Sequence, residues 1–230
     1  MQILPGTPFS VLTRVTTLVM YHDDGRKDYA AISVPSARAF AVAAGLNFQL
    51  HTATRYSLPF MQKVLFMRAA LADSERVIYS DIDVVFRPGA ADAEALFSGP
   101  FSMSVDLHGF CTGFMAFTKS PEVERLLRVW WDLGMLVSDD NSATLDQGTF
   151  KIIHRHFDWA KALVREIPTT LVSNPECGEL GAVAHHVWSR DDRLDRMQNL
   201  KWELSSAVEC LAYTQEAAGA APAAPTICLA

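Results

Sequence analysis

The chain has 230 residues, of which 50% are hydrophobic and 20% are charged, and its formal net charge is −6. A chain of this length and composition can bury a sizeable core, which excludes a disordered, collagenous or coiled-coil body. The excess of acidic residues argues against binding to nucleic acid or to anionic membranes, since both require a basic surface.

Cysteine usage and hydropathy add two further expectations. The cysteines form no CxxC pair, which argues against a zinc finger or a thioredoxin-like motif and favours free thiols in a reducing compartment. No run approaches the ~20 apolar residues of a membrane span. The apolar stretch at 15–21 leads directly into His22-Asp23-Asp24 and is expected to be a strand rather than a signal peptide. These features predict a cytoplasmic protein without a membrane span.

The first half of the chain alternates segments typical of strands with segments typical of helices. A β-branched apolar segment opens the series, and Gly45 ends the first helical pattern. This βαβαβ order predicts a parallel sheet with covering helices. The expected strands are residues 15–21, 47–52 and 76–80, and the expected helices are residues 36–44 and 59–72.

The second half is less regular. Residues 121–133 have a clear amphipathic pattern, with their large apolar side chains on one face of a helix. We expect one domain over residues 1–213 and an Ala/Pro-rich tail or linker over residues 214–230. The remaining expected strands are residues 101–105, 112–118, 163–167, 169–172 and 183–188, and the remaining expected helices are residues 145–156 and 190–200.

The strongest chemical signal is the pair Asp81 and Asp83, which follows the apolar strand of residues 76–80. On an extended chain both carboxylates point to the same face. Two ionised carboxylates at the end of a buried strand repel each other and lose solvation, and a divalent cation such as Mn²⁺ or Mg²⁺ compensates both effects. Open α/β sheets bind their ligands at the carboxyl ends of their strands. An exposed turn is the alternative, but the apolar residues 84–86 argue against it.

Two enzyme families place a DxD motif after an apolar strand. In haloacid-dehalogenase-like phosphatases, Asp81 would be the nucleophile and Asp83 the acid/base, but that motif normally lies on the first strand of its domain. In glycosyltransferases with the GT-A fold, the motif binds the metal and diphosphate of a nucleotide sugar. Two strands and two helices precede Asp81 here, which favours the glycosyltransferases.

The motifs that follow support the second family. A strand with Thr112-Gly113, an amphipathic helix and a helix that begins near Asp146-Gln147 come in this order. Over residues 59–196 this order resembles the glycogenin-type glycosyltransferases and related nucleotide-diphosphosugar transferases. The resemblance implies a single GT-A-like α/β domain with a central, mostly parallel sheet, one antiparallel strand and helices on both faces.

The resemblance also implies an activity. The enzyme would transfer a sugar from a nucleoside-diphosphate sugar, with uridine diphosphate favoured, to a hydroxyl of a carbohydrate or other acceptor. The reaction would depend on Mn²⁺ or Mg²⁺ and would retain the anomeric configuration. A domain that binds a nucleotide sugar without turnover is the remaining alternative.

Individual residues take roles by the same resemblance. Asp81 and Asp83 would hold the metal, with Asp81 also near the ribose. A late histidine would be the third ligand, and the spacing to Trp188 favours His185 over His186, of which only one can face the metal on a strand. The other implied roles are donor binding by Tyr21, Lys63, Arg68, Thr112 and Gly113, sugar contacts by Asp146 and Gln147, and proton abstraction in an inverting enzyme by Asp106 or Asp146.

Several of these roles have plain structural alternatives. Lys63 and Arg68 would also suit a solvated helix face, Tyr21 would suit ordinary packing near a strand end, and Asp146 would suit a helix N-cap.

The chain also departs from the family. The C-terminal HxxGxxKPW motif is not present, and its phosphate-binding lysine has three candidate replacements, Arg190, Arg193 and Lys201. Cys111-Thr112 stands where Asn-Ser is common in the family.

Overall fold

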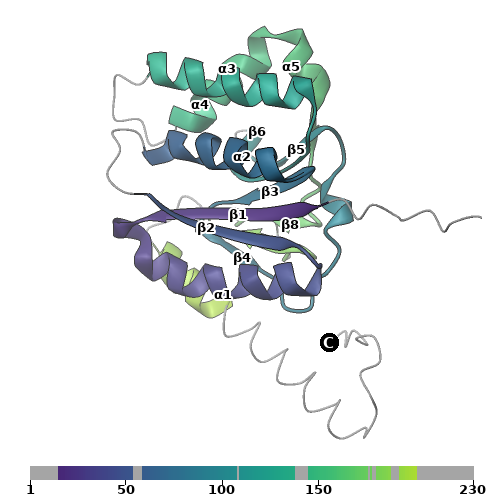
Figure 1. The fold of residues 1–230 in the computed structure, drawn as a ribbon. Helices are drawn as coiled ribbons and strands as arrows, with labels where there is room; N and C mark the ends of the chain where they lie inside the picture. Colours follow the sequence, from purple (N-terminus) through teal and green to yellow (C-terminus); the bar gives the residue numbers. More distant parts are fainter. Residues whose placement is uncertain are drawn as a thin grey trace, which may run out of the picture.

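The computed structural model describes residues 15–53, 59–107, 109–137, 145–175, 177, 180–187 and 192–200. A six-stranded sheet lies between two layers of helices (Figure 1), in the strand order β2-β1-β3-β6-β5-β7. The strands are β1 (Thr16–Asp23), β2 (Asn47–Ala53), β3 (Arg76–Ser80), β5 (Phe101–Asp106), β6 (Gly109–Thr118) and β7 (Val164–Glu166). The helices are α1 (Lys27–Ala43), α2 (Gln62–Asp73), α3 (Pro121–Val137), α4 (Leu145–His156) and α5 (Asp158–Leu163).

The sheet is parallel except at one strand. β1 pairs in parallel with β2 and β3, and β5 pairs in parallel with β7. β6 is antiparallel to both of its neighbours, β3 and β5. The predicted mostly parallel sheet with one antiparallel strand is therefore confirmed.

A hydrophobic core fills each face of this sheet because side chains alternate along the strands. Val19 of β1 packs with Met67 of α2 and Trp130 of α3 on one face. Leu18 of the same strand packs with Phe40 of α1 on the other. Helices thus cover both faces, as expected (Figure 1).

A second, small sheet was not predicted. It consists of β4 (Val84–Phe86), β9 (Ala184–His186) and β8 (Val172–Ser173), in the order β4-β9-β8. β4 follows the DxD motif directly, and it pairs antiparallel with β9, so that Val84 lies opposite His186. This pairing brings the late histidines to the two aspartates.

The first helix is longer than its predicted range of residues 36–44. It begins at Lys27 and continues through Pro35, which has no N–H for the helical hydrogen-bond ladder. Two serine hydroxyls donate to carbonyls of the same helix, Ser33 Oγ to Tyr29 O at 3.1 Å and Ser36 Oγ to Ser33 O at 2.8 Å. Burial of Ile32 and Ser33 favours the extended helix.

Other expectations are confirmed or fall outside the described ranges. The helix predicted over residues 145–156 matches α4, and residues 193–200 are helical within the predicted range of residues 190–200. Cys111 and Cys177 are free thiols. None of the helices in the described ranges combines the length and the apolar character that crossing a bilayer requires. The predicted tail at residues 214–230 lies outside these ranges, as do residues 1–14 and the family-motif candidates Arg190 and Lys201.

Candidate active site

The candidate site lies at the carboxyl end of β3. Asp81 follows the strand and its backbone N–H donates to Gly113 O at 2.7 Å, which joins it to β6. Ile82 and Asp83 form a turn, so the two carboxylates converge through that turn and not along an extended strand as predicted. The turn is required because β4 leaves the main sheet for the small one.

Three potential metal ligands meet at this turn. One ligand atom each from Asp81, Asp83 and His186 all lie within 4.8 Å of one another. His186 Nε2 is 3.2 Å from Asp83 Oδ1. Two carboxylates and one imidazole suit Mn²⁺ and related divalent ions.

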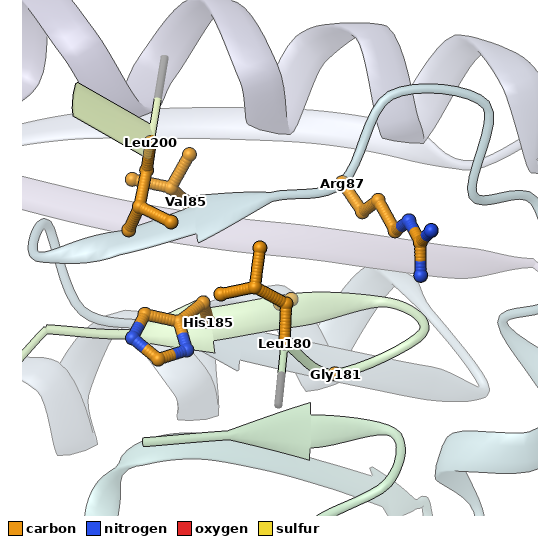
Figure 2. A pocket seen from close by; sticks show the side chains of 7 residues that line it. Val85, Arg87, Leu180, Gly181, His185 and Leu200 are labelled. Carbon is orange, nitrogen blue, oxygen red and sulfur yellow. The ribbon is translucent and has the colours of Figure 1, made fainter. Parts of the chain in front are cut away.

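The preference for His185 over His186 was wrong in this geometry. Neighbouring residues on β9 face opposite sides, and His186 lies opposite Val84 while His185 lies opposite Val85. His185 Nδ1 is 2.7 Å from Ser173 Oγ, which itself accepts a hydrogen bond from Gly181 N–H. Burial lowers the pKa of His185 to about 4. Figure 2 shows His185 in a small pocket whose other lining residues are Val85, Arg87, Leu180, Gly181, Ala184 and Leu200.

Asp83 is buried, with 8% of its surface exposed, and has a guanidinium and an imidazole as neighbours. Arg193 Nη1 donates to its Oδ2 at 2.8 Å, and His186 faces its Oδ1. Burial raises the pKa of Asp83, but His186 and Arg193 lower it by more than burial raises it, so the net shift is downward. Burial lowers the pKa of His186, but Cys111 and Asp83 together outweigh burial and hold this pKa well above its usual value.

Asp81 belongs to a second group of charges around Lys63. Lys63 is 2% exposed, and its Nζ lies 3.0 Å from Asp81 Oδ1 and 2.7 Å from Asp146 Oδ2. It also donates to Thr112 O at 3.2 Å. These carboxylates outweigh the effect of burial and raise the pKa of Lys63. Lys63 is thus an internal cation of the site, and the alternative of a solvated helix face was wrong.

Hydrogen bonds orient both carboxylates of this group. Tyr79 Oη donates to Asp81 Oδ1 and Thr112 Oγ1 donates to Asp146 Oδ2, each at 2.5 Å. Trp130 Nε1 donates to the backbone carbonyl of Asp146 at 2.9 Å. The net pKa of Asp81 is raised, chiefly by burial, and Lys63 offsets only part of that effect.

Gly113 leaves room for the candidate metal ligand. A Cβ atom at this position would overlap the imidazole ring of His186. The register of β5 against β6 shifts between Met103 and Ser104, so residues 112–114 have no partner on β5. Such an irregularity redirects the local backbone toward the site.

Of the other residues predicted for the site, Gln147, Asp106 and Tyr21 have contacts that bear on their predicted roles. Gln147 Nε2 lies 3.5 Å from Asp106 Oδ2, so the structure brings these two side chains together. Tyr21 packs on Phe66 with ring centroids 5.5 Å apart, and its pKa is raised by burial and influenced by Lys63 and Asp81. Tyr21 also lies near Tyr79, with ring centroids 6.4 Å apart, and Tyr79 donates to Asp81, so Tyr21 lies beside the charge cluster.

Arg68 is not brought to the site. It lines a cavity of about 250 Å³ between α2 and α3. A separation of five residues turns it ~140° around the helix from Lys63, because each residue of an α-helix turns by ~100°. The cavity's other lining residues are Leu71, Ala72, Glu124, Leu127 and Arg128.

The sequence analysis did not predict Tyr79 as a site residue, and it did not decide whether Arg193 is one. Tyr79 stands two residues before Asp81, and this spacing on a strand would have placed it on the same face. Arg193 was one of three candidate replacements for the family lysine, and its contact with Asp83 separates it from the others. Only the fold supplies that contact, since 110 residues separate the two in sequence.

Comparison with solved structures identifies the fold. The first is a glycosyltransferase involved in the glycosylation of the major capsid of PBCV-1, with 16% identity over 80% of this chain and 98% of that chain and a TM-score of 0.63. The fold is that of GT-A glycosyltransferases. The apo-form glycosyltransferase GlyE of Streptococcus pneumoniae TIGR4 matches with 12% identity over 81% of this chain and 60% of that chain and a TM-score of 0.55.

A third solved structure and two sequence comparisons complete the findings. The galactosyltransferase LgtC, in complex with donor and acceptor sugar analogs, has 15% identity over 82% of this chain and 96% of that chain and a TM-score of 0.46. No protein-family model matches the chain. No curated protein matches it.

Proposed function

We propose that this protein is a metal-dependent glycosyltransferase that moves a sugar from a nucleoside-diphosphate sugar to an acceptor hydroxyl. The observation that carries the proposal is the convergence of Asp81, Asp83 and His186 at the carboxyl end of β3. This edge of an open α/β sheet is where such folds bind their ligands. The GT-A fold supports the same chemistry.

The residues fit a divalent cation. Asp83 Oδ1 is buried and receives no well-directed hydrogen bond from any residue in the described ranges. Its second oxygen is held by Arg193, which leaves Oδ1 directed toward His186 and Asp81. Asp81, Asp83 and His186 would hold Mn²⁺ or Mg²⁺. When bound, the ion supplies Lewis-acid stabilisation of the departing diphosphate.

Two cations of the chain would bind the anionic donor. Lys63 already contacts Asp81 and Asp146, and Arg193 already contacts Asp83. Both are therefore fixed beside the metal ligands, where preorganised positive charge stabilises negative charge that develops during transfer. Tyr21, close to these charges, would pack against the nucleotide, with uridine the favoured base.

The sugar would lie against Thr112, Gly113, Asp146 and Gln147. Asp146 is fixed by Lys63 and Thr112, and Gln147 by Asp106, so these side chains can orient sugar hydroxyls. Oδ2 of Asp146 is already occupied by Lys63 and Thr112, which makes it less available to an acceptor hydroxyl. We therefore favour retention, with the leaving diphosphate accepting the acceptor proton. If the enzyme inverts, Asp106 is the better candidate base.

The phosphatase alternative is less well supported. It requires a lysine near Asp81, and Lys119 was the candidate from the sequence. Lys119 lies at the opposite end of β3, because its backbone N–H donates to Glu75 O and its Nζ donates to Ala72 O. Lys63 contacts Asp81 instead and would meet this requirement, so what disfavours the phosphatase is the position of Asp81 after the third strand of the chain together with the GT-A fold.

Release of nucleoside diphosphate from a panel of nucleotide sugars tests the proposal. The panel is run with Mn²⁺, with Mg²⁺ and with a chelator, and with Asp83→Asn as the variant. We expect one nucleotide to be released in the presence of metal, with loss of the signal in the variant. Lys119→Met is the matched control because it alters a charge outside the site. Release of inorganic phosphate from simple phosphomonoesters, with no turnover of any nucleotide sugar, would refute the proposal.

A further inference from the structure

His186 is held by contacts on both ring nitrogens. Its Nε2 lies 3.2 Å from Asp83 Oδ1, and its Nδ1 lies 3.5 Å from the sulfur of Cys111. The ring packs closely against Gly113, where a Cβ atom would overlap it. His186 and Cys111 are each only 5% exposed, so water does not readily replace either contact.

A metal-binding imidazole needs a defined tautomer. If Nε2 is to offer its lone pair to an ion, Nδ1 must carry the proton and donate it to a neighbour. In most metal sites this neighbour is a carboxylate, a backbone carbonyl or water. Here Cys111 Sγ is within hydrogen-bonding reach of Nδ1.

We propose that Cys111 is a positioning residue for the candidate metal site: its sulfur accepts the Nδ1–H of His186 and so directs Nε2 toward Asp81 and Asp83. This role rests on the proposed function, because it presupposes that the cluster binds a divalent ion. No bond is made to the metal by Cys111. Its sulfur lies on the far side of the ring from Nε2.

The backbone of β6 explains how a cysteine reaches this position. Cys111 lies opposite Ser104 of β5, on the near side of the register shift at residues 112–114. Ser104 Oγ donates to the carbonyl of Cys111 at 3.4 Å. Cys111 therefore lies in a fixed strand segment next to the irregular one that carries Gly113, and a flexible loop is not needed to place it.

Mn²⁺ affinity, measured by calorimetry on the folded full-length chain without nucleotide, tests this role. Cys111→Val removes the acceptor at similar volume, and Cys111→Ser keeps a hydrogen-bonding group. Loss of a partner of this kind typically weakens metal binding by about 10- to 100-fold. We expect that loss for Cys111→Val and substantial recovery in Cys111→Ser. Cys177→Val, at the other free thiol of the described ranges, is the matched control and should bind like wild type.

A double-variant cycle separates positioning from general damage to the fold. In a His186→Gln background, Cys111→Val should cause no further loss of Mn²⁺ affinity, because the side chain it acts through is absent. Folding is checked for each variant by urea unfolding. Folded Cys111→Val with wild-type Mn²⁺ affinity would overturn the positioning role alone. A wild-type chain and Cys177→Val that both bind no Mn²⁺ would instead refute the metal site on which the proposed function depends.

Discussion

Lys63→Met should destabilise the fold, because it removes the cation that Asp81 and Asp146 share. Lys63 is almost fully buried, and Asp146 has a side-chain exposure of only 6%. Breaking a buried ion pair by removing one partner costs about 3–5 kcal/mol, since the remaining charge is uncompensated. Asp81 is more accessible, at 27%, and Tyr79 still donates to it, so the lower end of that range applies.

Urea unfolding in the presence of a chelator measures this effect. A loss of about 3 kcal/mol corresponds to a fall in melting temperature of about 6–12 °C for a chain of this size. Lys119→Met, a change at an exposed lysine, should stay within about 0.5 kcal/mol of wild type. Adding Asp146→Asn to Lys63→Met should recover part of the loss, because one of the two uncompensated charges is removed. A Lys63→Met variant as stable as wild type would refute the assignment of Lys63 as an internal cation.

Three further outcomes follow from the geometry. Gly113→Ala should displace the His186 ring and weaken Mn²⁺ binding by at least about tenfold in calorimetry. Burial lowers the pKa of His185 to about 4 from a usual value of 6.5. As pH falls from 6.5 to 4 the unfolded chain binds a proton at this residue before the folded chain does, so stability is lost over this range. His185→Gln should flatten that part of the pH dependence of urea unfolding. Arg68→Ala should leave nucleotide affinity unchanged in titrations with Mn²⁺, since the side chain lies between α2 and α3.

The sequence predicted the helices and strands of the first half of the chain, because short-range hydrophobic patterns determine them. The order of β1, β2 and β3, with α2 between the last two, follows from apolar runs and helical periodicity within short windows. The first helix was predicted too short, since α1 begins at Lys27 and includes Pro35. Burial of Ile32 and Ser33 on the same helix offsets the cost of this proline, and helix propensity alone does not include burial.

The site was predictable in its motifs but not in its register. Asp81, Asp146 and Lys63 were each predicted as site residues and the structure brings them together, although the contact of Lys63 with the two carboxylates was not predicted. The choice between His185 and His186 depends on which residue of β9 lies opposite Val84, and one step in register reverses the answer. No pattern within residues 183–188 carries that information, since β4 supplies it from a distant part of the chain.

The charged residues of the site form two groups, each of which pairs carboxylates with basic side chains. Asp81 and Asp146 share Lys63, which comes from α2 in the first half of the chain. Asp83 has Arg193 and His186, which come from the second half. The two groups meet only at the turn between Asp81 and Asp83. A divalent ion bound there would join the carboxylate of one group to the carboxylate and imidazole of the other, so ion binding should stabilise the pairing of β9 with β4 as well as the donor site.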